Sequence, residues 1–164
     1  MRKGQAMAKI DTEVLFNKLK AHFQANIPVV IAAINTEKGD GNDMLVPDSA
    51  AYIDLDLDTK AMNYDPFVFI YIDRQNSEVR GGVVSKEIKF DCTLFVAKSG
   101  LDNENILALR YSRMMEEVAS LAWDKAFRGF RFDIETLDPV DVQLRNSTKW
   151  HKVYGVALTV SLAN

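Results

Sequence analysis

The stretch Phe67-Val68-Phe69-Ile70-Tyr71-Ile72 decides the fold class, because six consecutive aromatic and β-branched residues favour a β-strand over a helix. Apolar side chains at both odd and even positions predict that this strand lies centrally in a sheet. Residues 74–82 are polar and end in Gly81-Gly82, which is typical of a turn. Residues 84–96 then alternate apolar and polar side chains, which predicts a long antiparallel strand with one face exposed to solvent.

Helices are expected on the N-terminal side of this strand pair. Asp11 or Thr12 can cap a first helix, in which apolar residues recur at helical spacing as far as Ile27. Pro28 interrupts the pattern before the apolar run 29–34 resumes it. We therefore expect a second short helix with Pro28 in its first turn, where the missing N–H costs nothing.

A long helix and further strands are expected on the C-terminal side. Apolar residues recur every three or four positions from residue 107 to 121, which predicts a helix over 100–128 that stops at Gly129. Alternating patterns at 130–135, 140–144 and 154–162 predict three more strand segments. This order predicts an α+β fold: a mainly antiparallel or mixed sheet of four to five strands, with the long helix and the N-terminal helices packed on one face.

The length and composition are those of one folded domain. The chain has 164 residues, 48% hydrophobic and 26% charged, which predicts a single domain over 1–164 with a flexible N-terminus at 1–10. Twenty basic and 23 acidic residues give a net charge of −3, so no overall basic field exists for gripping nucleic acid. The apolar run 27–34 is too short to cross a membrane, and residues 1–10 lack the apolar core of a secretory signal. A cytoplasmic protein without a membrane partner is the expectation.

An acidic connecting loop is expected at 35–66. It holds eight acidic residues against two lysines, a net charge of −6. Within it, Asp54, Asp56 and Asp58 alternate with leucines and resemble the start of a calcium-binding loop. The sixth position of that loop is Thr59, where the sharp turn requires glycine, and the twelfth is Asp65, where glutamate is usual. We therefore predict a half-buried strand with an acidic face, and keep a metal site at the three aspartates as the alternative.

No residue pattern for catalysis or cofactor binding stands out elsewhere. His22, His151 and Cys92 are too few and too far apart in sequence for a zinc site, and Cys92 on an apolar strand face is expected to be inert. We therefore expect no enzyme activity, no catalytic residue and no cofactor. A surface for single-stranded nucleic acid needs aromatic residues interleaved with basic ones. The nearest approach, which fits equally well as core or subunit contacts, consists of Arg128, Arg131, Lys149, Trp150, Lys152 and Tyr154.

Two segments carry a resemblance to a known family. They are residues 19–40, Leu-Lys-Ala-His-Phe-Gln-Ala-Asn-Ile-Pro-Val-Val-Ile-Ala-Ala-Ile-Asn-Thr-Glu-Lys-Gly-Asp, and the ending Tyr154-Gly-Val-Ala-Leu-Thr-Val-Ser-Leu. Together with the order of the expected elements, they resemble the tail terminator (tail completion) proteins of long-tailed bacteriophages, which belong to the neck and to head–tail joining. The resemblance implies a structural protein of the virion, assembled in the cytoplasm of the bacterial host, without a reaction, a cofactor or catalytic positions.

The same resemblance implies particular partners. Such proteins form a ring, commonly a hexamer, which caps the tail tube and offers a docking surface to the head-closure or connector protein. DNA passes through the bore without sequence-specific binding. The alternatives are a head-closure, connector or other minor tail protein, a small metal-dependent enzyme or metal-binding domain built on Asp54, Asp56 and Asp58, and a regulatory ligand-binding domain.

A ring requires two different contact surfaces on each subunit. We predict contacts with neighbouring copies or rings through aromatic residues and through the polar turn; the candidates are Phe67, Phe69, Tyr71, Trp123, Phe127, Phe130, Trp150, Arg74, Glu78 and Arg80. We also predict that the acidic loop faces the bore or its rim, where negative charge keeps passing DNA from adhering. The candidates for that position are Asp40, Asp43, Asp48, Asp54, Asp56 and Asp58.

Overall fold

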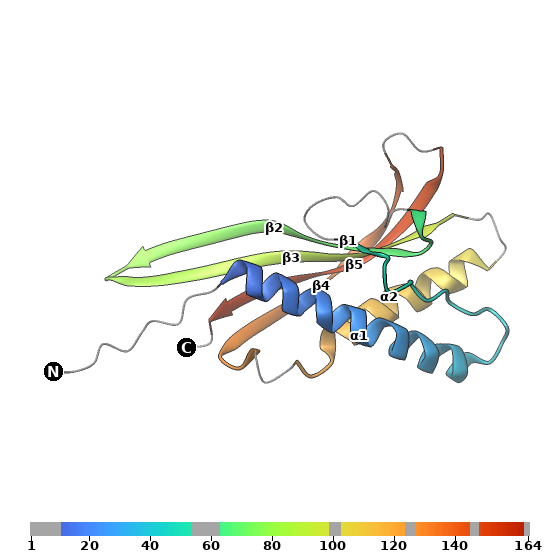
Figure 1. Ribbon diagram of the computed structural model, residues 1–164, viewed down its shortest axis with the longest axis horizontal. Coiled ribbons are helices and arrows are strands. Elements are labelled where there is room, and N and C mark those ends of the chain that lie inside the picture. The colour runs from blue at the N-terminus through green and yellow to red at the C-terminus, as the bar shows by residue number, and fades with distance from the viewer. Residues whose placement is uncertain (1–10, 54–62, 99–102, 124–126, 145–147, 163–164) are drawn as a thin grey trace.

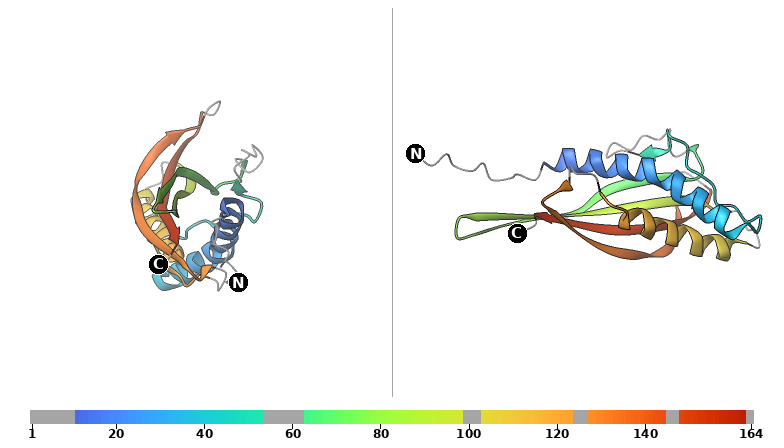
Figure 2. Two further views of the ribbon diagram at one scale, coloured as in Figure 1. Left: turned by 90° about the vertical axis from the view of Figure 1, so that its left-hand side faces the viewer. Right: turned by 90° about the horizontal axis from the view of Figure 1, so that it is seen from below.

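The computed structural model describes residues 11–53, 63–98, 103–123, 127–144 and 148–162. Within these residues two helices and five strands follow one another in the order α1 (Thr12–Lys38), β1 (Tyr52–Ile53), β2 (Phe67–Arg80), β3 (Val83–Ala97), α2 (Glu104–Ser120), β4 (Phe130–Gln143) and β5 (Trp150–Leu162). The strands form one sheet in the order β1-β2-β3-β5-β4, in which β1 and β2 are parallel and the other neighbours antiparallel. Both helices lie on the same face of this curved sheet (Figure 1, Figure 2). The predicted α+β fold with a mixed sheet is confirmed.

The N-terminal part of the chain forms one helix, so the predicted break at Pro28 is wrong. Asp11 caps α1, because its Oδ1 accepts a hydrogen bond from the backbone N–H of Val14 at 3.1 Å. Beyond Pro28 the buried side chains Val30, Ile31 and Ile34 continue the apolar stripe of the first part. An interior proline costs about 3 kcal/mol, whereas burying each of these three side chains contributes about 1.5–3 kcal/mol. Packing therefore outweighs the local penalty.

The second helix is shorter than predicted. α2 ends at Ser120, because Leu121 is extended with a φ of −65° and a ψ of 151°, so the predicted end at Gly129 is wrong. Trp123, which follows the helix, stacks on His22 of α1 with ring centroids 3.7 Å apart and on Phe132 of β4 with centroids 4.8 Å apart. Ending the helix early lets Trp123 join α1 to β4.

The polar stretch 74–82 is mostly strand and not the predicted turn. β2 continues to Arg80 and β3 begins at Val83, which leaves a two-residue connection at Gly81 and Gly82. Both glycines have positive φ angles, 57° and 79°, as tight hairpin turns of this kind require. The paired strands project beyond the helices (Figure 1). We call this projecting part, residues 73–87, the arm.

The segments predicted at 130–135 and 140–144 are parts of one strand, β4. The pairing of β4 with β5 shifts between Leu137 and Val140, on either side of Pro139. Proline has no N–H to donate to a neighbouring strand. It is tolerated here because β4 lies at the edge of the sheet and the irregularity absorbs the missing bond.

The core lies between the helices and one face of the sheet. Side chains of β2, β3 and β5, such as Ile70, Phe90 and Leu158, pack there against α1 and α2. A smaller apolar cluster centred on Phe67 and Ile53 lies apart from it. In the part of the chain that the structure describes, no helix is both long and apolar enough to span a membrane.

Gly155 of β5 lies where the sheet leaves no room for a side chain. A β-carbon there would lie 2.8 Å from the carbonyl oxygen of Cys92 and 3.0 Å from Cγ2 of Thr93. We expect Gly155→Ala to lower the free energy of unfolding by about 1–3 kcal/mol, because β3 and β5 must separate locally. Urea unfolding followed by circular dichroism measures the loss. Gly82→Asn is the control, since its turn is open and asparagine tolerates a positive φ; an equal loss there would contradict the explanation.

Candidate functional site

The arm is exposed to solvent along β2. Every residue from 73 to 79 is exposed, including Val79 at 69%. Arg74 and Glu78 pair in register with Lys89 and Ser85, and Arg80 pairs with Val83 beside the turn. The polar contact residues predicted from the sequence therefore lie along the arm, although as parts of a strand and not of a turn.

The base of the arm is fixed to α1. The Nζ of Lys86 donates a hydrogen bond to Oγ1 of Thr12 at 3.0 Å. The alternation of β3 places Lys86 on the same side of the sheet as Ile88 and Phe90, which belong to the core. Lys86, a polar residue on the core side of this strand, is thus a link between the arm and the first turn of α1.

The sheet has two free edges within the described residues. β1 pairs with β2 only through Tyr52↔Val68 and Ile53↔Phe69, so residues 70–80 of β2 have no described strand on their outer side. β4 has β5 on one side and no described strand on the other. Edge strands present unpaired N–H and C=O groups that can pair with another chain. The two edges lie on opposite sides of the sheet and are different in sequence.

The sheet face away from the helices, which we call the open face, carries a polar row at its centre. Tyr71 of β2 lies opposite Asp91 of β3, Asp91 opposite Ala157 of β5, and Ala157 opposite Glu135 of β4. Asp91 is only 8% exposed, and its buried Oδ1 has no hydrogen-bond partner. Burial raises the pKa of Asp91, while a hydrogen bond with Tyr71 opposes that rise. The row therefore holds a poorly solvated carboxylate beside an aromatic ring.

The aromatic contact residues predicted from the sequence differ in how much surface they offer. Phe67 is 1% exposed and Phe127 is 5% exposed, so both are buried within the monomer. Trp123 and Phe130 are half-buried and pack against the core. On the open face the rings of Phe69 and Tyr71 stack with centroids 5.0 Å apart. Trp150, at the start of β5, is 51% exposed.

The first part of the acidic loop is tied to the helix layer. Arg110 of α2, which is 7% exposed, donates hydrogen bonds to both carboxylate oxygens of Asp40 and to the carbonyl oxygen of Asn42. These bonds hold the pKa of Asp40 well below its usual range. Asp43 and Asp48 are exposed. The other candidates for facing the bore lie outside the described residues: Asp54, Asp56 and Asp58. The same three aspartates are the candidates for the metal site.

His22 is half-buried, and His151 and Cys92 are buried. His22 Nε2 lies 2.9 Å from the carbonyl oxygen of Val118, and burial lowers the pKa of His22. His151 is 5% exposed, and burial lowers its pKa as well. Cys92 is fully buried, and burial raises the pKa of its thiol, which disfavours the reactive thiolate. No three His, Cys, Asp or Glu side chains of the described residues are placed to hold a metal ion.

A small cavity lies where β3, β5 and the start of α2 meet. Its volume is about 140 Å³, and the stacked rings of Tyr111 and Tyr154 line it together with Lys98, Lys152 and Glu104. At about 30 Å³ for each water molecule of the liquid, it has room for only a few. The cavity can hold a small polar group but not a nucleotide.

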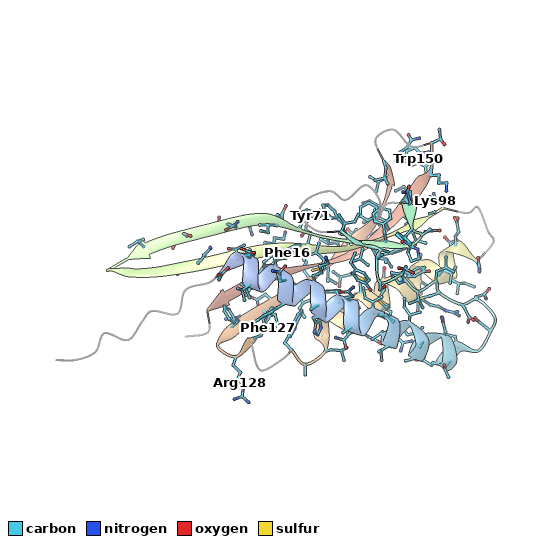
Figure 3. The ribbon with its side chains drawn as sticks, viewed as in Figure 1. Phe16, Tyr71, Lys98, Phe127, Arg128 and Trp150 are labelled. Atoms are coloured by element: carbon cyan, nitrogen blue, oxygen red, sulfur yellow. The ribbon has the colours of Figure 1, made fainter. Side chains whose placement is uncertain are left out.

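The basic and aromatic residues considered for nucleic acid do not form one surface. Arg128 lies far from Trp150 and Lys98 (Figure 3). At the end that carries Trp150, Lys98 forms an ion pair with Asp141 at 3.0 Å. This acid offsets part of the local positive charge. The described structure therefore does not gather these residues into a basic strip.

No protein-family model and no curated protein matches this chain. The features of this chain that bear on its function are therefore those of its structure: the arm, the two free edges and the open face. Of these, the sequence patterns indicated residues of the arm and the aromatic pair at Phe69 and Tyr71. They missed the edges and the polar row at Asp91, because both depend on the order and register of strands distant in sequence.

The lowered histidine pKa values predict that acid destabilises the fold. Each folded-state pKa lies below the unfolded value of 6.5, so the unfolded chain binds more protons and stability falls as the pH drops through 6.5. We expect the free energy of unfolding to decrease between pH 7 and pH 5.5, and to decrease less in His22→Gln and His151→Gln. Asp91 acts in the opposite direction because its pKa is raised. Urea unfolding at each pH measures the effect; equal slopes in wild type and both variants would contradict it.

Proposed function

We propose that this chain is a ring-forming structural protein of a tailed bacteriophage, a tail terminator that caps the tail tube and joins it to the head. The observation that carries the proposal is the pair of different free edges, β2 and β4, at opposite sides of one sheet. A closed ring of identical subunits needs two different, mutually complementary surfaces on each copy. The two different edges are our candidates for these surfaces, and the arm extends the β2 edge.

Strand directions support pairing between these edges. β2, β3, β5 and β4 alternate in direction, so β4 runs antiparallel to β2. When copies are related by rotation about an axis along the strands, β2 of one copy meets β4 of the next in antiparallel orientation. The alternation then continues from subunit to subunit. Main-chain hydrogen bonds would provide affinity at this contact, and side chains on each face would provide specificity.

The other proposed partners are the tail tube protein and the head-closure or connector protein. The arm projects beyond the helices, which allows it to reach an adjacent ring (Figure 1). The chain carries a net charge of −3, which favours passage of DNA without adhesion. Assembly in the host cytoplasm and residence in the neck of the virion follow from this role.

A head-closure, connector or other minor tail protein is the second candidate. The same edges and arm would serve such a role. No described feature favours the metal-dependent alternative, whose three aspartates lie outside the described residues.

Loss of the protein distinguishes a terminator from other neck roles. We expect particles that lack it to carry abnormally long tails, because nothing stops polymerisation of the tube. Electron microscopy of the particles measures tail length. Light scattering of the purified chain, alone and with purified tail tubes, is expected to show a ring on the tubes. Normal tails with unjoined heads would contradict the terminator, and a monomer under every condition would contradict the ring.

Shortening the arm separates assembly from folding. Deleting residues 78–79 together with 84–85 removes two cross-strand pairs, keeps the turn and preserves the alternation of faces. The arm becomes about 7 Å shorter. We expect joining of purified tails to heads to fall about tenfold, equivalent to about 1.4 kcal/mol. The melting temperature should change little, because residues 78 and 79 are exposed. Val79→Thr, which keeps the length, is the control; undiminished joining by the shortened arm would refute its role.

A further inference from the structure

The arm presents charged side chains at fixed positions along the free edge of β2. Arg74, Asn76 and Glu78 are all exposed. Arg74 pairs in register with Lys89, which lies on the open face because its neighbour Ile88 belongs to the core. Every second residue of a strand shares a face, so all three side chains lie on the open face. Along this edge the chain therefore offers a cation, an amide and a carboxylate in that order.

The free edge of β4 carries charges of the complementary kind on the same face. Arg131, Asp133 and Glu135 are exposed, and they alternate along β4 with Phe130 and Phe132, which pack against the core. Arg131 and Asp133 form an ion pair at 3.5 Å, in which the two side chains are 71% and 61% exposed. Ion pairs exposed to this extent contribute little to stability. Both groups can therefore exchange this contact for one with a neighbouring chain.

One antiparallel register of β2 against β4 matches all of these groups. Side chains directly opposite each other share a face, so the possible registers differ by steps of two residues. The matching register gives three opposed pairs: Arg74 with Glu135, Asn76 with Asp133, and Glu78 with Arg131.

The neighbouring registers are worse in charge. A shift by two residues in one direction sets Glu78 opposite Asp133, and in the other direction Arg74 opposite Asp133 is the one pair of opposite charge among the three positions. Shifts by four residues set Arg74 opposite Arg131 or Glu78 opposite Glu135. Like charges directly opposite each other destabilise a strand pair, whereas opposite charges stabilise it. Charge therefore selects one register.

We propose that β2 of one copy pairs with β4 of the next in this register, with Arg74 opposite Glu135 and Glu78 opposite Arg131. The occupant of each edge is a second copy of this chain, and the inference rests on the proposed ring. Within its own chain Arg74 lies opposite the like charge of Lys89, so a carboxylate on its outer side is favourable. The contribution of these exposed pairs falls with ionic strength.

The same register staggers neighbouring copies by a small step. Within one chain Asn76, Glu87, Ser161 and Arg131 form one row across the sheet. In the proposed contact Arg131 lies opposite Glu78, two residues further along β2, which is a step of about 7 Å. Closing a sheet on itself requires tilted strands and a stagger of this kind. The turn at residues 81–82 lies beyond the start of β4 in this register, so it remains available to another partner.

Exchange of charges tests the pairing without a cross-link. We expect Arg74→Glu to weaken association of the full chain about tenfold, since two carboxylates then oppose each other. Adding Glu135→Arg should restore association to within about threefold of the wild type. Adding Asp133→Arg instead is the matched control, because it would restore only a register shifted by two residues. Sedimentation velocity measures association, and circular dichroism checks folding. Unweakened association in Arg74→Glu, or rescue by Asp133→Arg and not by Glu135→Arg, would overturn the register.

Engineered disulfides test the register directly. Asn76→Cys and Asp133→Cys lie opposite each other across the proposed contact. Within one chain these positions are three strand spacings apart, about 14 Å, which is too far for a disulfide. The native Cys92 is buried and does not compete. The double variant is assembled alone and with purified tail tubes, and is then oxidised with diamide. We expect a ladder of linked subunits on a non-reducing gel.

The control for the disulfide is Asn76→Cys with Glu135→Cys, which is shifted by two residues and should link about tenfold less. Light scattering before oxidation records whether each variant has formed rings. Equal linking in the shifted pair, or rings of the matched pair without links, would overturn the register and leave the proposed function standing. A wild-type chain that forms no ring, alone or on tubes, would overturn the proposed function and the inference with it.

Discussion

The burial of one apolar stripe of α1 against the sheet is the constraint on which the rest of the structure depends. Leu19, Phe23, Ile27 and Ile31 are all 0% exposed, and α2 packs beside α1 on the same face. Two helices can cover only one face of a five-stranded sheet. The two edges and the arm are left exposed, whereas the centre of the face away from the helices is buried within the chain, with Ala157 2% and Asp91 8% exposed.

The sequence predicts the fold class well and the boundaries of its elements less well. Alternation along 84–96 and 154–162 correctly predicts two of the long strands, because one face of each lies on the core. Prediction fails where tertiary contacts outweigh local propensity. The helix continues through Pro28 because the apolar residues on both sides of it are buried. The second helix ends before Trp123, whose ring stacks on His22. The β2 half of the arm is predicted as part of a turn because residues 74–78 are all polar, which removes the apolar alternation that reveals a strand.

The candidate surfaces are predictable only in part, because several of them exist through register. Asp91 looks like one of several polar residues on an alternating strand, and Ala157 like one of several small ones. Only the pairing of β3 with β5 and of β5 with β4 places Ala157 between Asp91 and Glu135. Likewise, nothing local marks Arg110 as the anchor of the acidic loop, since its partner Asp40 lies 70 residues away. The sequence shows which polar and charged residues the chain has, but not which of them lie close together in the fold.

The free edges carry features that limit indiscriminate pairing. The register of β2 shifts between Ile72 and Arg74, charged residues follow along the arm, and the register of β4 shifts around Pro139. Irregularities, charge and proline are the usual means by which edge strands avoid aggregation. In the proposed ring, a neighbour would therefore pair over the regular stretches of the two edges, which limits how far the pairing extends. We infer that a second contact must act together with the edges. In the proposed ring, the arm is placed to supply this second contact, because it projects beyond the helices (Figure 1).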